Sequence, residues 1–558
     1  MTFAPTPSQT IGTIEAVLAA DDFNRDDYKN DGAHTYIYSQ EETKSQLPIT
    51  DENIIRMPLS SANCHVVQFD KSFITLKVEA TIPITGYTAS NDNSGNSLQA
   101  AMRNALDVFV GFKHSTDAIG RYNIKHKNRV VAGMSQDHGT LESFLYHSYR
   151  SQDDLTNRRG IHTIAESAFK DDLNSVCGEY ITLQECLDAH ASTTAKDKIT
   201  KTFSLIIPFN DILMFQQFRD YPSELFGSLD IEFVFNPKAF VYKQCERNAC
   251  FQASIIRHNM SDSGTLIDLY NNKWQNSIDV EYAQIGDSIK GYVNATYASS
   301  KATYNIGSLT FGIPTIKIVE AHSTICGYNI NPNKLEDLRE KYKTQLWTKF
   351  TQTVSAQEFS SSFKPGVGFV SQLAAFDNTT DMVVLFPTTT NESFGTVYKN
   401  PMMEGLILSV MGRKYPDMPL DTTTPRFAAM MLNASDTLHA APLKEYVDSL
   451  SIYRYDDGGK IYPTCDLTTF FMTLKCERPS AMGMIMDGID SRGRQVAVRL
   501  SGQIKDSSKD EYQTKNPPPP ILALVNDAVI AFSTANGGMI KFSTEPIWND
   551  YPTSPDDD

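Results

Sequence analysis

The segment from residue 202 to residue 243 constrains the fold more than any other part of the chain. It opens with an apolar run, Phe203 to Ile207, which Pro208 ends, as expected for a strand. Apolar residues then recur at helical spacing over a stretch of about ten residues. From Leu229 to Phe235, every second residue is apolar, which indicates a strand with one buried face. The segment therefore predicts a strand, a short helix and a returning strand.

Large apolar side chains in this segment are predicted to pack the helix against the two strands. Buried aromatic residues contribute strongly to the stability of a core, because each removes a large apolar area from water. The predicted packing residues are Phe209, Phe215, Phe218, Tyr221, Leu225 and Phe233. We expect a structural role for all six.

Length and composition favour a large protein built mainly of strands. The chain has 558 residues, which is too long for one compact core and suggests roughly two to four domains. Its 30 Phe and 25 Tyr, together with frequent Thr, Val and Ile, favour pleated surfaces. We therefore expect a mainly β fold, with two tandem antiparallel β-sandwiches and short inserted helices.

The periodicity of apolar residues predicts individual elements in both halves of the chain. Residues 74–82 alternate as in a half-buried strand, whereas residues 98–112 have the spacing of an amphipathic helix. A second helix is predicted near residue 335, with Asn333 as its N-cap and Glu336 completing the capping box. Further strands are predicted at residues 381–386, 406–411, 450–455, 468–474 and 495–504, before a final hairpin over residues 521–542.

These elements divide the chain into two β domains with flanking segments. The predicted parts are an N-terminal arm (1–48), a first β domain (49–256), a connector (257–304), a second β domain (305–548) and an acidic C-terminal tail (549–558).

The charge of the chain argues against direct recognition of nucleic acid. A net charge of −16 repels a phosphate backbone, and the most basic stretch, Lys125 to Arg129, is typical of a solvated loop or strand edge. The N-terminus lacks the features of a signal peptide, and no apolar run approaches the ~20 residues of a membrane span. We therefore expect the protein to be made in soluble form inside the cell.

The sequence contains no recognisable catalytic or metal-binding motif. There is no G-x-S-x-G, no H-E-x-x-H, no phosphate-binding G-x-x-x-x-G-K-[ST] and no dinucleotide-binding glycine motif. The eight cysteines are scattered without any C-x-x-C pair, so we expect buried thiols in a reducing compartment. We predict no enzyme activity, no cofactor and no metal.

Short stretches in both halves of the chain are similar to one family of viral proteins. The first half contains, in order, KSFITLKVEATI, NALDVFVGF, IGRYNIKHKNRVV, ESFLYHSY, IIPFNDILMFQQF and LFGSLDIEFVFN. The second half contains MVVLFPTT, LILSVMGRKYP and the closing NDAVIAFSTANGGMIKF hairpin. In this order they resemble the double jelly roll major capsid proteins, especially those of polinton-like viruses and virophages. Within the resemblance, residues 202–243 look like the connection between strands F and G of a capsid jelly roll.

The resemblance implies a viral major capsid protein. Each chain of that family holds two jelly-roll sandwiches, and three chains form a pseudo-hexagonal capsomer of an icosahedral shell around a double-stranded DNA genome. The implied partners are further copies of the chain, penton proteins and minor or cement proteins, and the implied location is the virion. Contact with an inner membrane or a host receptor is left open. The family offers no catalytic residues to transfer.

Two other functions are compatible with a β-sandwich protein. The first is a different virion part, either a penton or a host-binding spike, although a penton normally has one jelly roll and a spike has a stalk or a separate head. The second is a carbohydrate-active enzyme, which would need a cleft with paired carboxylates and stacked Trp. The chain has only three Trp, which disfavours the enzyme.

Three aromatic residues do not fit an obvious core strand. Phe359, Phe363 and Phe369 lie among Ser, Gly and Lys. They are predicted either to contribute to an interface between chains or to pack beneath their own loop.

Overall fold

The computed structural model consists mainly of antiparallel strands, in agreement with the composition. It describes residues 35–50, 53–88, 106–112, 115–134, 177–182, 185–186, 188–189, 197–215, 220–246, 283–284, 296–298, 303–305, 308–311, 314–344, 346–362, 368–387, 403–420, 471–476, 488–491, 494–504, 519–534 and 539–543.

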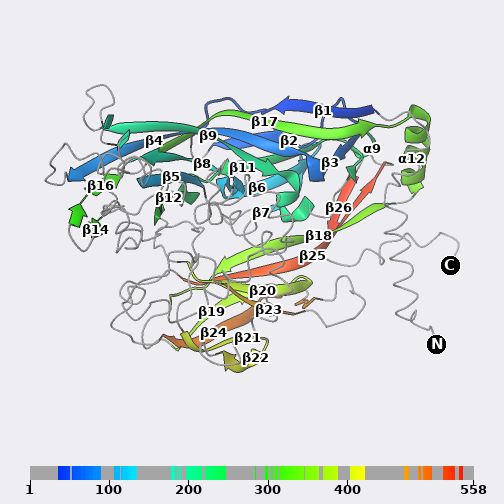
Figure 1. Ribbon diagram of the computed structural model, residues 1–558. Coiled ribbons are helices and arrows are strands. Elements are labelled where there is room, and N and C mark those ends of the chain that lie inside the picture. Colours follow the sequence, from blue (N-terminus) through cyan, green and yellow to red (C-terminus); the bar gives the residue numbers. More distant parts are fainter. Residues whose placement is uncertain are drawn as a thin grey trace, which may run out of the picture.

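Eight strands of the first half form two facing antiparallel sheets (Figure 1). They are β1 (Thr35–Glu42), β2 (Ile54–Pro58), β4 (Phe73–Thr88), β6 (Ile119–His126), β7 (Arg129–Met134), β9 (Lys198–Pro208), β11 (Leu229–Phe235) and β17 (Thr315–Asn329). One sheet has the order β1-β17-β4-β9, and the other has the order β2-β11-β6-β7. Lettered B to I along the chain, the sheets read B-I-D-G and C-H-E-F, which is the strand order of a jelly roll.

Eight strands of the second half repeat this arrangement. They are β18 (Trp347–Glu358), β19 (Phe369–Ala374), β20 (Thr379–Leu385), β21 (Met403–Val410), β22 (Arg413–Leu420), β23 (Phe471–Lys475), β24 (Val496–Ile504) and β25 (Ile521–Ser533). The orders β18-β25-β20-β23 and β19-β24-β21-β22 again read B-I-D-G and C-H-E-F. The chain is a double jelly roll.

Smaller elements extend or connect these sheets. β3 (Val66–Gln68) continues the D position of the first jelly roll beside β17, and β26 (Met539–Ser543) pairs with the end of β25. A separate sheet contains β5 (Leu106–Phe112), β8 (Gly178–Thr182), β12 (Phe240–Glu246) and β13 (Ala283–Gln284). The remaining short strands are β14 (Thr296–Ala298), β15 (Thr303–Asn305) and β16 (Ser308–Phe311). The first half also contains the short 3-10 turns η2 (Ser115–Ala118) and η5 (Pro237–Ala239).

The two jelly rolls are stacked in the same orientation, so that the four main sheets form four layers (Figure 1). From top to bottom, the figure shows the sheets of β1, of β2, of β18 and of β19. The C-H-E-F sheet of the first jelly roll therefore faces the B-I-D-G sheet of the second. One B-I-D-G face and one C-H-E-F face remain on the outside of the stack.

The burial pattern of single strands follows from this stacking. β4 lies in an outer layer, and its side chains alternate between buried and half-buried positions from Phe73 to Ile82. β25 lies in an inner layer, and nearly all of its side chains are buried. A strand covered on both faces is apolar on both faces, which explains the continuous apolar run ILALV at its start.

Strand pairing departs from the domain division expected from the sequence. β1 lies within the predicted arm, residues 1–48, but pairs along its whole length with β17. β16 and β17 lie within the predicted second domain, residues 305–548, but pair with β4. The first jelly roll therefore extends from β1 to β17, beyond residues 49–256 at both ends. Within the predicted connector, 257–304, the structure describes β13, β14 and most of β15, and residues 549–558 lie outside the described residues.

Most predicted strands with described residues are confirmed, but several local predictions are wrong. Residues 106–112 of the predicted helix form β5, which pairs with β8 and β12 and is rich in Val and Phe, residues that favour strands, whereas residues 98–105 lie outside the described residues. The N-cap of α12 (Pro332–Thr344) is Asn331, whose Oδ1 accepts the Asn333 N–H at 3.0 Å, since Pro332 takes the first helical position. Residues 202–243 connect strands G and H instead of F and G. The predicted strand 450–455 and the stretch ESFLYHSY lie outside the described residues.

Candidate functional site: the junction between the two jelly rolls

In its described residues, the connection between β9 and β11 contains four short elements. They are η3 (Phe209–Asp211), η4 (Leu213–Phe215), β10 (Asp220–Tyr221) and α9 (Ser223–Phe226). The Ile212 N–H donates to the Phe209 carbonyl and the Phe215 N–H donates to the Ile212 carbonyl, which is the spacing of 3-10 turns. The predicted single helix is therefore wrong, because extended backbone at Ile212 (ψ 118°) separates the two turns.

The predicted packing residues lie in or beside this connection. Five of the six are buried, namely Phe209, Phe215, Tyr221, Leu225 and Phe233, and Phe218 lies outside the described residues. Phe69 of η1 (Phe69–Lys71) lies among three of them. Its ring centroid is 5.5 Å from that of Phe209, 5.0 Å from that of Phe215 and 5.8 Å from that of Tyr221. Their contribution to stability remains a prediction.

A second group of aromatic rings joins the first jelly roll to the second. This junction cluster consists of Tyr221, Phe226, Tyr342, Trp347 and Phe532. Phe226 of α9 stacks on Trp347 of β18 with ring centroids 5.1 Å apart and an interplanar angle of 20°. Its centroid is 5.3 Å from that of Phe532 in β25, and Tyr221 lies 5.6 Å from the same ring. The G–H connection of one sandwich thus packs against strands B and I of the other.

Polar contacts fix the backbone around the junction cluster. The Tyr221 hydroxyl donates to the Gly227 carbonyl at 2.7 Å, and the His126 Nε2 lies 2.6 Å from the Phe226 carbonyl oxygen. Across the two sandwiches, the Thr351 hydroxyl donates to the Met214 carbonyl at 2.5 Å. These bonds satisfy polar atoms that would otherwise be buried without partners, and therefore specify one arrangement of the rings.

Burial shifts the protonation of two groups at the junction. It lowers the pKa of His126 below 6.5, while the hydrogen bond to the Phe226 carbonyl acts in the opposite direction and the neighbouring Lys127 adds to the lowering. Burial also raises the pKa of the Tyr221 hydroxyl well above 10. The junction therefore favours a neutral imidazole that donates Nε2–H to the carbonyl.

Helix α12 carries the chain from the first jelly roll to the second and is attached to both. Tyr342 packs on Phe226, with ring centroids 5.5 Å apart. At the other side, the Thr534 hydroxyl donates to the Arg339 carbonyl at 2.8 Å, and the Thr534 N–H donates to the Tyr342 carbonyl. Bonds to the last carbonyls of a helix stabilise its C-terminal end. The linker is therefore a packed element and not a free tether.

Sequence reasoning missed three members of the junction cluster: Phe226, Trp347 and Phe532. Phe226 follows the predicted packing residue Leu225 directly, and Trp347 is one of three Trp in the chain. Their partners lie more than 100 residues away in sequence, so no local pattern pairs them. The continuous apolar character of β25 was the available signal, because it indicates a strand covered on both faces.

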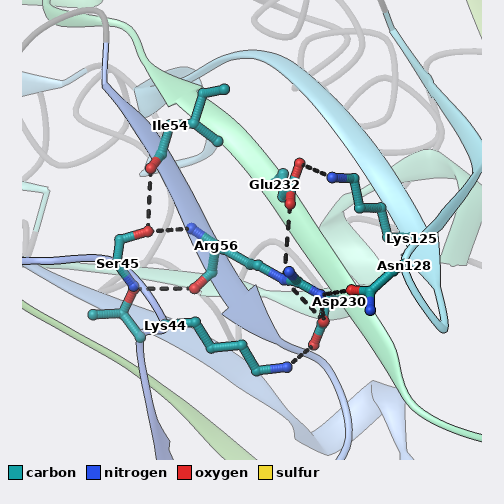
Figure 2. A network of polar contacts seen from close by, with 9 residues as sticks. Lys44, Ser45, Ile54, Arg56, Lys125, Asn128, Asp230 and Glu232 are labelled. Carbon is teal, nitrogen blue, oxygen red and sulfur yellow. Dashed lines mark hydrogen bonds and ion pairs between the residues drawn. The ribbon is translucent and has the colours of Figure 1, made fainter.

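A network of charged side chains lies on the face of the first C-H-E-F sheet that points away from the core of its own sandwich (Figure 2). Asp230 of β11 accepts hydrogen bonds from Lys44 at 2.7 Å and from Arg56 of β2 at 2.6 Å. Arg56 also donates to Asn128 Oδ1 at 2.5 Å, and Lys125 of β6 pairs with Glu232 at 2.5 Å. The Asp230 side chain is 5% exposed, so its charge requires these partners.

The charged network and the buried thiols of Cys64 and Cys186 fit a structural role. Each carboxylate of the network is paired with a cation on the same sheet face, which ties strands C, H and E together. Burial raises the pKa of the Cys64 thiol to about 11 and that of Cys186 to about 12, so both stay protonated and unreactive.

In the described part of the chain, no group of three or more His, Cys, Asp or Glu is placed to hold a metal ion. No helix among the described residues has the length and apolar character needed to cross a membrane.

Comparison with known proteins gives matches to solved structures alone. No protein-family model and no curated protein matches the chain. A chain from the cryo-EM structure of the Sputnik virophage is similar with 11% identity and a TM-score of 0.47, over 93% of this chain and 91% of that chain. The mavirus major capsid protein is similar with 9% identity and a TM-score of 0.47, over 93% and 92%. A chain of the PBCV-1 virus capsid has 8% identity and a TM-score of 0.42, over 92% and 97%.

Proposed function

We propose that this chain is the major capsid protein of a virus, with a structural role and no catalytic activity. The observation that supports the proposal is the jelly-roll strand order, present twice in one chain, with the two sandwiches held together by a buried junction. The sequence resemblance to double jelly roll major capsid proteins agrees with it. Shell proteins must present rigid blocks of fixed shape, and the junction cluster provides this rigidity.

The proposed assembly is a cyclic trimer. Each chain supplies two jelly rolls, so a closed ring of three chains supplies six and gives a pseudo-hexagonal capsomer that can tile a shell. The partners in this proposal are further copies of the chain, followed by penton and minor or cement proteins of the virion. Neither an inner membrane nor a host receptor is assigned.

Light scattering and electron microscopy of the purified protein test the proposal. Light scattering at neutral pH is expected to give three times the 62.3 kDa mass of the chain. Negative-stain images are expected to show hexagonal particles. A protein that remains monomeric at every concentration up to its solubility limit would contradict the proposal.

A further inference from the structure

In each jelly roll, the start of strand B pairs with the end of strand I, and we call this place the B–I corner. The B–I corner of the second jelly roll is covered, whereas that of the first is open. In the second jelly roll, Trp347 at the start of strand B pairs with Phe532 at the end of strand I. In the first, Tyr36 at the start of strand B pairs with Tyr328 at the end of strand I. The Trp347–Phe532 corner lies beneath the G–H connection of the first jelly roll. The Tyr36–Tyr328 corner lies in the outermost layer, where no other part of the described chain stacks on it (Figure 1).

The open corner carries a patch of exposed aromatic side chains. Tyr36 and Tyr38 of the edge strand β1 are 54% and 65% exposed. They pair with Tyr328 and Cys326 of β17, which form the floor of the patch. The Lys71 ammonium lies 5.6 Å from the centre of the Tyr36 ring. Adjacent, exposed Tyr residues are typical of surfaces that bind another protein.

The opposite end of the stack is also open and partly apolar. This distal face is the outer surface of the C-H-E-F sheet of the second jelly roll. Phe369 and Leu373 of β19 and Met411, which follows β21, are between 47% and 53% exposed. The Arg499 guanidinium lies 3.7 Å from the centre of the Phe369 ring. An aromatic residue, Met and Arg are the residue types enriched in interfaces.

The turns between strands E and F show which faces meet. In the first jelly roll, Lys127 and Asn128 form this turn with φ of 46° and 69°. In the second, Met411 and Gly412 form the equivalent turn with φ of 52° and 79°. The first turn follows directly on His126, whose ring contacts Phe532 with centroids 6.3 Å apart. Within one chain, the E–F turn of the first jelly roll therefore lies beside the B–I corner of the second.

We infer that the tyrosine patch of one copy binds the distal face of a second copy, with Met411 and its turn lying against Tyr36 and Tyr38. This inference rests on the proposed function and names its copy-to-copy interface. A second copy is the occupant because the described part of the chain has one open face of each kind, and the same two kinds of face already meet within the chain. Such a contact is heterologous, so its repetition closes a ring instead of ending at a dimer.

Acidic substitutions at the two faces test the inference. Tyr38→Glu places a charge on the patch and Met411→Glu places one on the distal face. Each is expected to raise the dissociation constant of the trimer at least about tenfold, since central contacts of an interface carry most of its affinity. Ile54→Glu is the matched control, because Ile54 is 58% exposed but lies on the first C-H-E-F sheet, away from both open faces. It is expected to leave the trimer intact.

Mixing the two variants distinguishes a heterologous contact from a symmetric one. The Tyr38→Glu chain keeps an intact distal face, and the Met411→Glu chain keeps an intact patch. At a concentration between the dissociation constants of the parent and of the variants, an equimolar mixture is therefore expected to form particles of two chains, while each variant alone stays monomeric. Dimers of Met411→Glu alone would overturn the inference, because they would show the patch binding another patch.

Controls separate this inference from the proposed function. Melting temperatures within about 2 °C of the parent show that the variants fold. If Tyr38→Glu melts earlier, Tyr38→Ser takes its place. If the parent and both acidic variants form equally stable trimers, the inferred interface is wrong and the proposed function stands. If the parent protein itself is monomeric, the inferred interface and the proposed function both fail.

Discussion

A single glycine allows the G–H connection to turn back into the sheet. Gly227 follows α9 with φ of 103° and ψ of 177°, a backbone region that residues with a side chain rarely occupy. A Cβ built there would lie 2.2 Å from Cε of Lys127. Lys127 can move away, so the backbone conformation determines most of the cost of a substitution.

We predict that Gly227→Ala lowers the free energy of unfolding by about 1–3 kcal/mol, because alanine is strained in this region. Gly368→Ala is the control, since a Cβ at Gly368 meets no atom within 4 Å and its φ lies outside the left-handed region. Urea unfolding of both variants measures the difference. Equal stability of the two variants would show that the backbone at Gly227 is not strained by a side chain.

His126 is expected to make the stability of the junction depend on pH. Its pKa in the folded protein is lowered by burial, so the unfolded chain binds the proton more readily. The stabilisation is therefore fully present above the ordinary value of 6.5 and is lost as the pH falls through the lowered pKa. We predict a smaller loss of stability between pH 7.5 and 5.5 for His126→Gln than for the parent, measured by urea unfolding. The same loss in both proteins would contradict this role.

At the scale of elements, α9 depends on its packing and not on its own helical stability. It has four residues, and a helix of this length is not stable alone because nucleation is unfavourable. Phe226 attaches it to Trp347, Phe532 and Tyr342 at once. We predict that Phe226→Ala costs about 3–5 kcal/mol, as for a buried Phe in a core.

Phe369→Ala provides the control for Phe226→Ala, since its ring is half-exposed in the isolated chain. Chemical unfolding of monomeric protein, below the concentration at which chains associate, is expected to show a small change for Phe369→Ala. A small change for Phe226→Ala as well would mean that α9 is not held by its aromatic contacts. Phe359, in contrast, is buried, so Phe359 and Phe369 do not share one role, and Phe363 lies outside the described residues.

The sequence predicted elements where one face is buried and the other is open. Alternation identified β4 and β11 because each has a polar outer face. It failed for β5, where apolar residues at several spacings fit a helix equally well, and for β1, whose outward Tyr36 and Tyr38 are aromatic. The 3-10 turns η3 and η4 were also beyond reach, since helical spacing does not distinguish them from one longer helix over so few residues.

At the scale of the whole molecule, the order of strands could be predicted only by resemblance. The partner of β1 is β17, almost 300 residues later, and no local signal identifies it. The same distance explains why the first jelly roll was expected to end near residue 256. The six predicted packing residues lie in or beside the correct connection, but the rings that join the two sandwiches come from α9, α12, β18 and β25 together.

Because these rings are shared, the two jelly rolls are expected to unfold as one unit. Trp347 is fully buried and stacks on Phe226, so it belongs to the junction that the two sandwiches share. We predict one calorimetric transition for the monomeric parent protein, with the calorimetric enthalpy equal to the van't Hoff enthalpy. Trp347→Ala leaves a cavity in the junction while keeping each separate sandwich core, and is expected to split the transition into two.

The control for this prediction is Val498→Ala, which removes buried volume from β24, far from the junction. It is expected to lower the transition temperature of the parent without splitting it, since a core defect in one sandwich still destabilises a coupled pair as a whole. Two transitions in the parent protein would show that the sandwiches fold independently, and α12 would then act as a tether between separate domains. One transition in Trp347→Ala would instead mean that polar contacts couple the unfolding of the two sandwiches. The hydrogen bond from the Thr351 hydroxyl to the Met214 carbonyl would then be the next contact to remove by substitution.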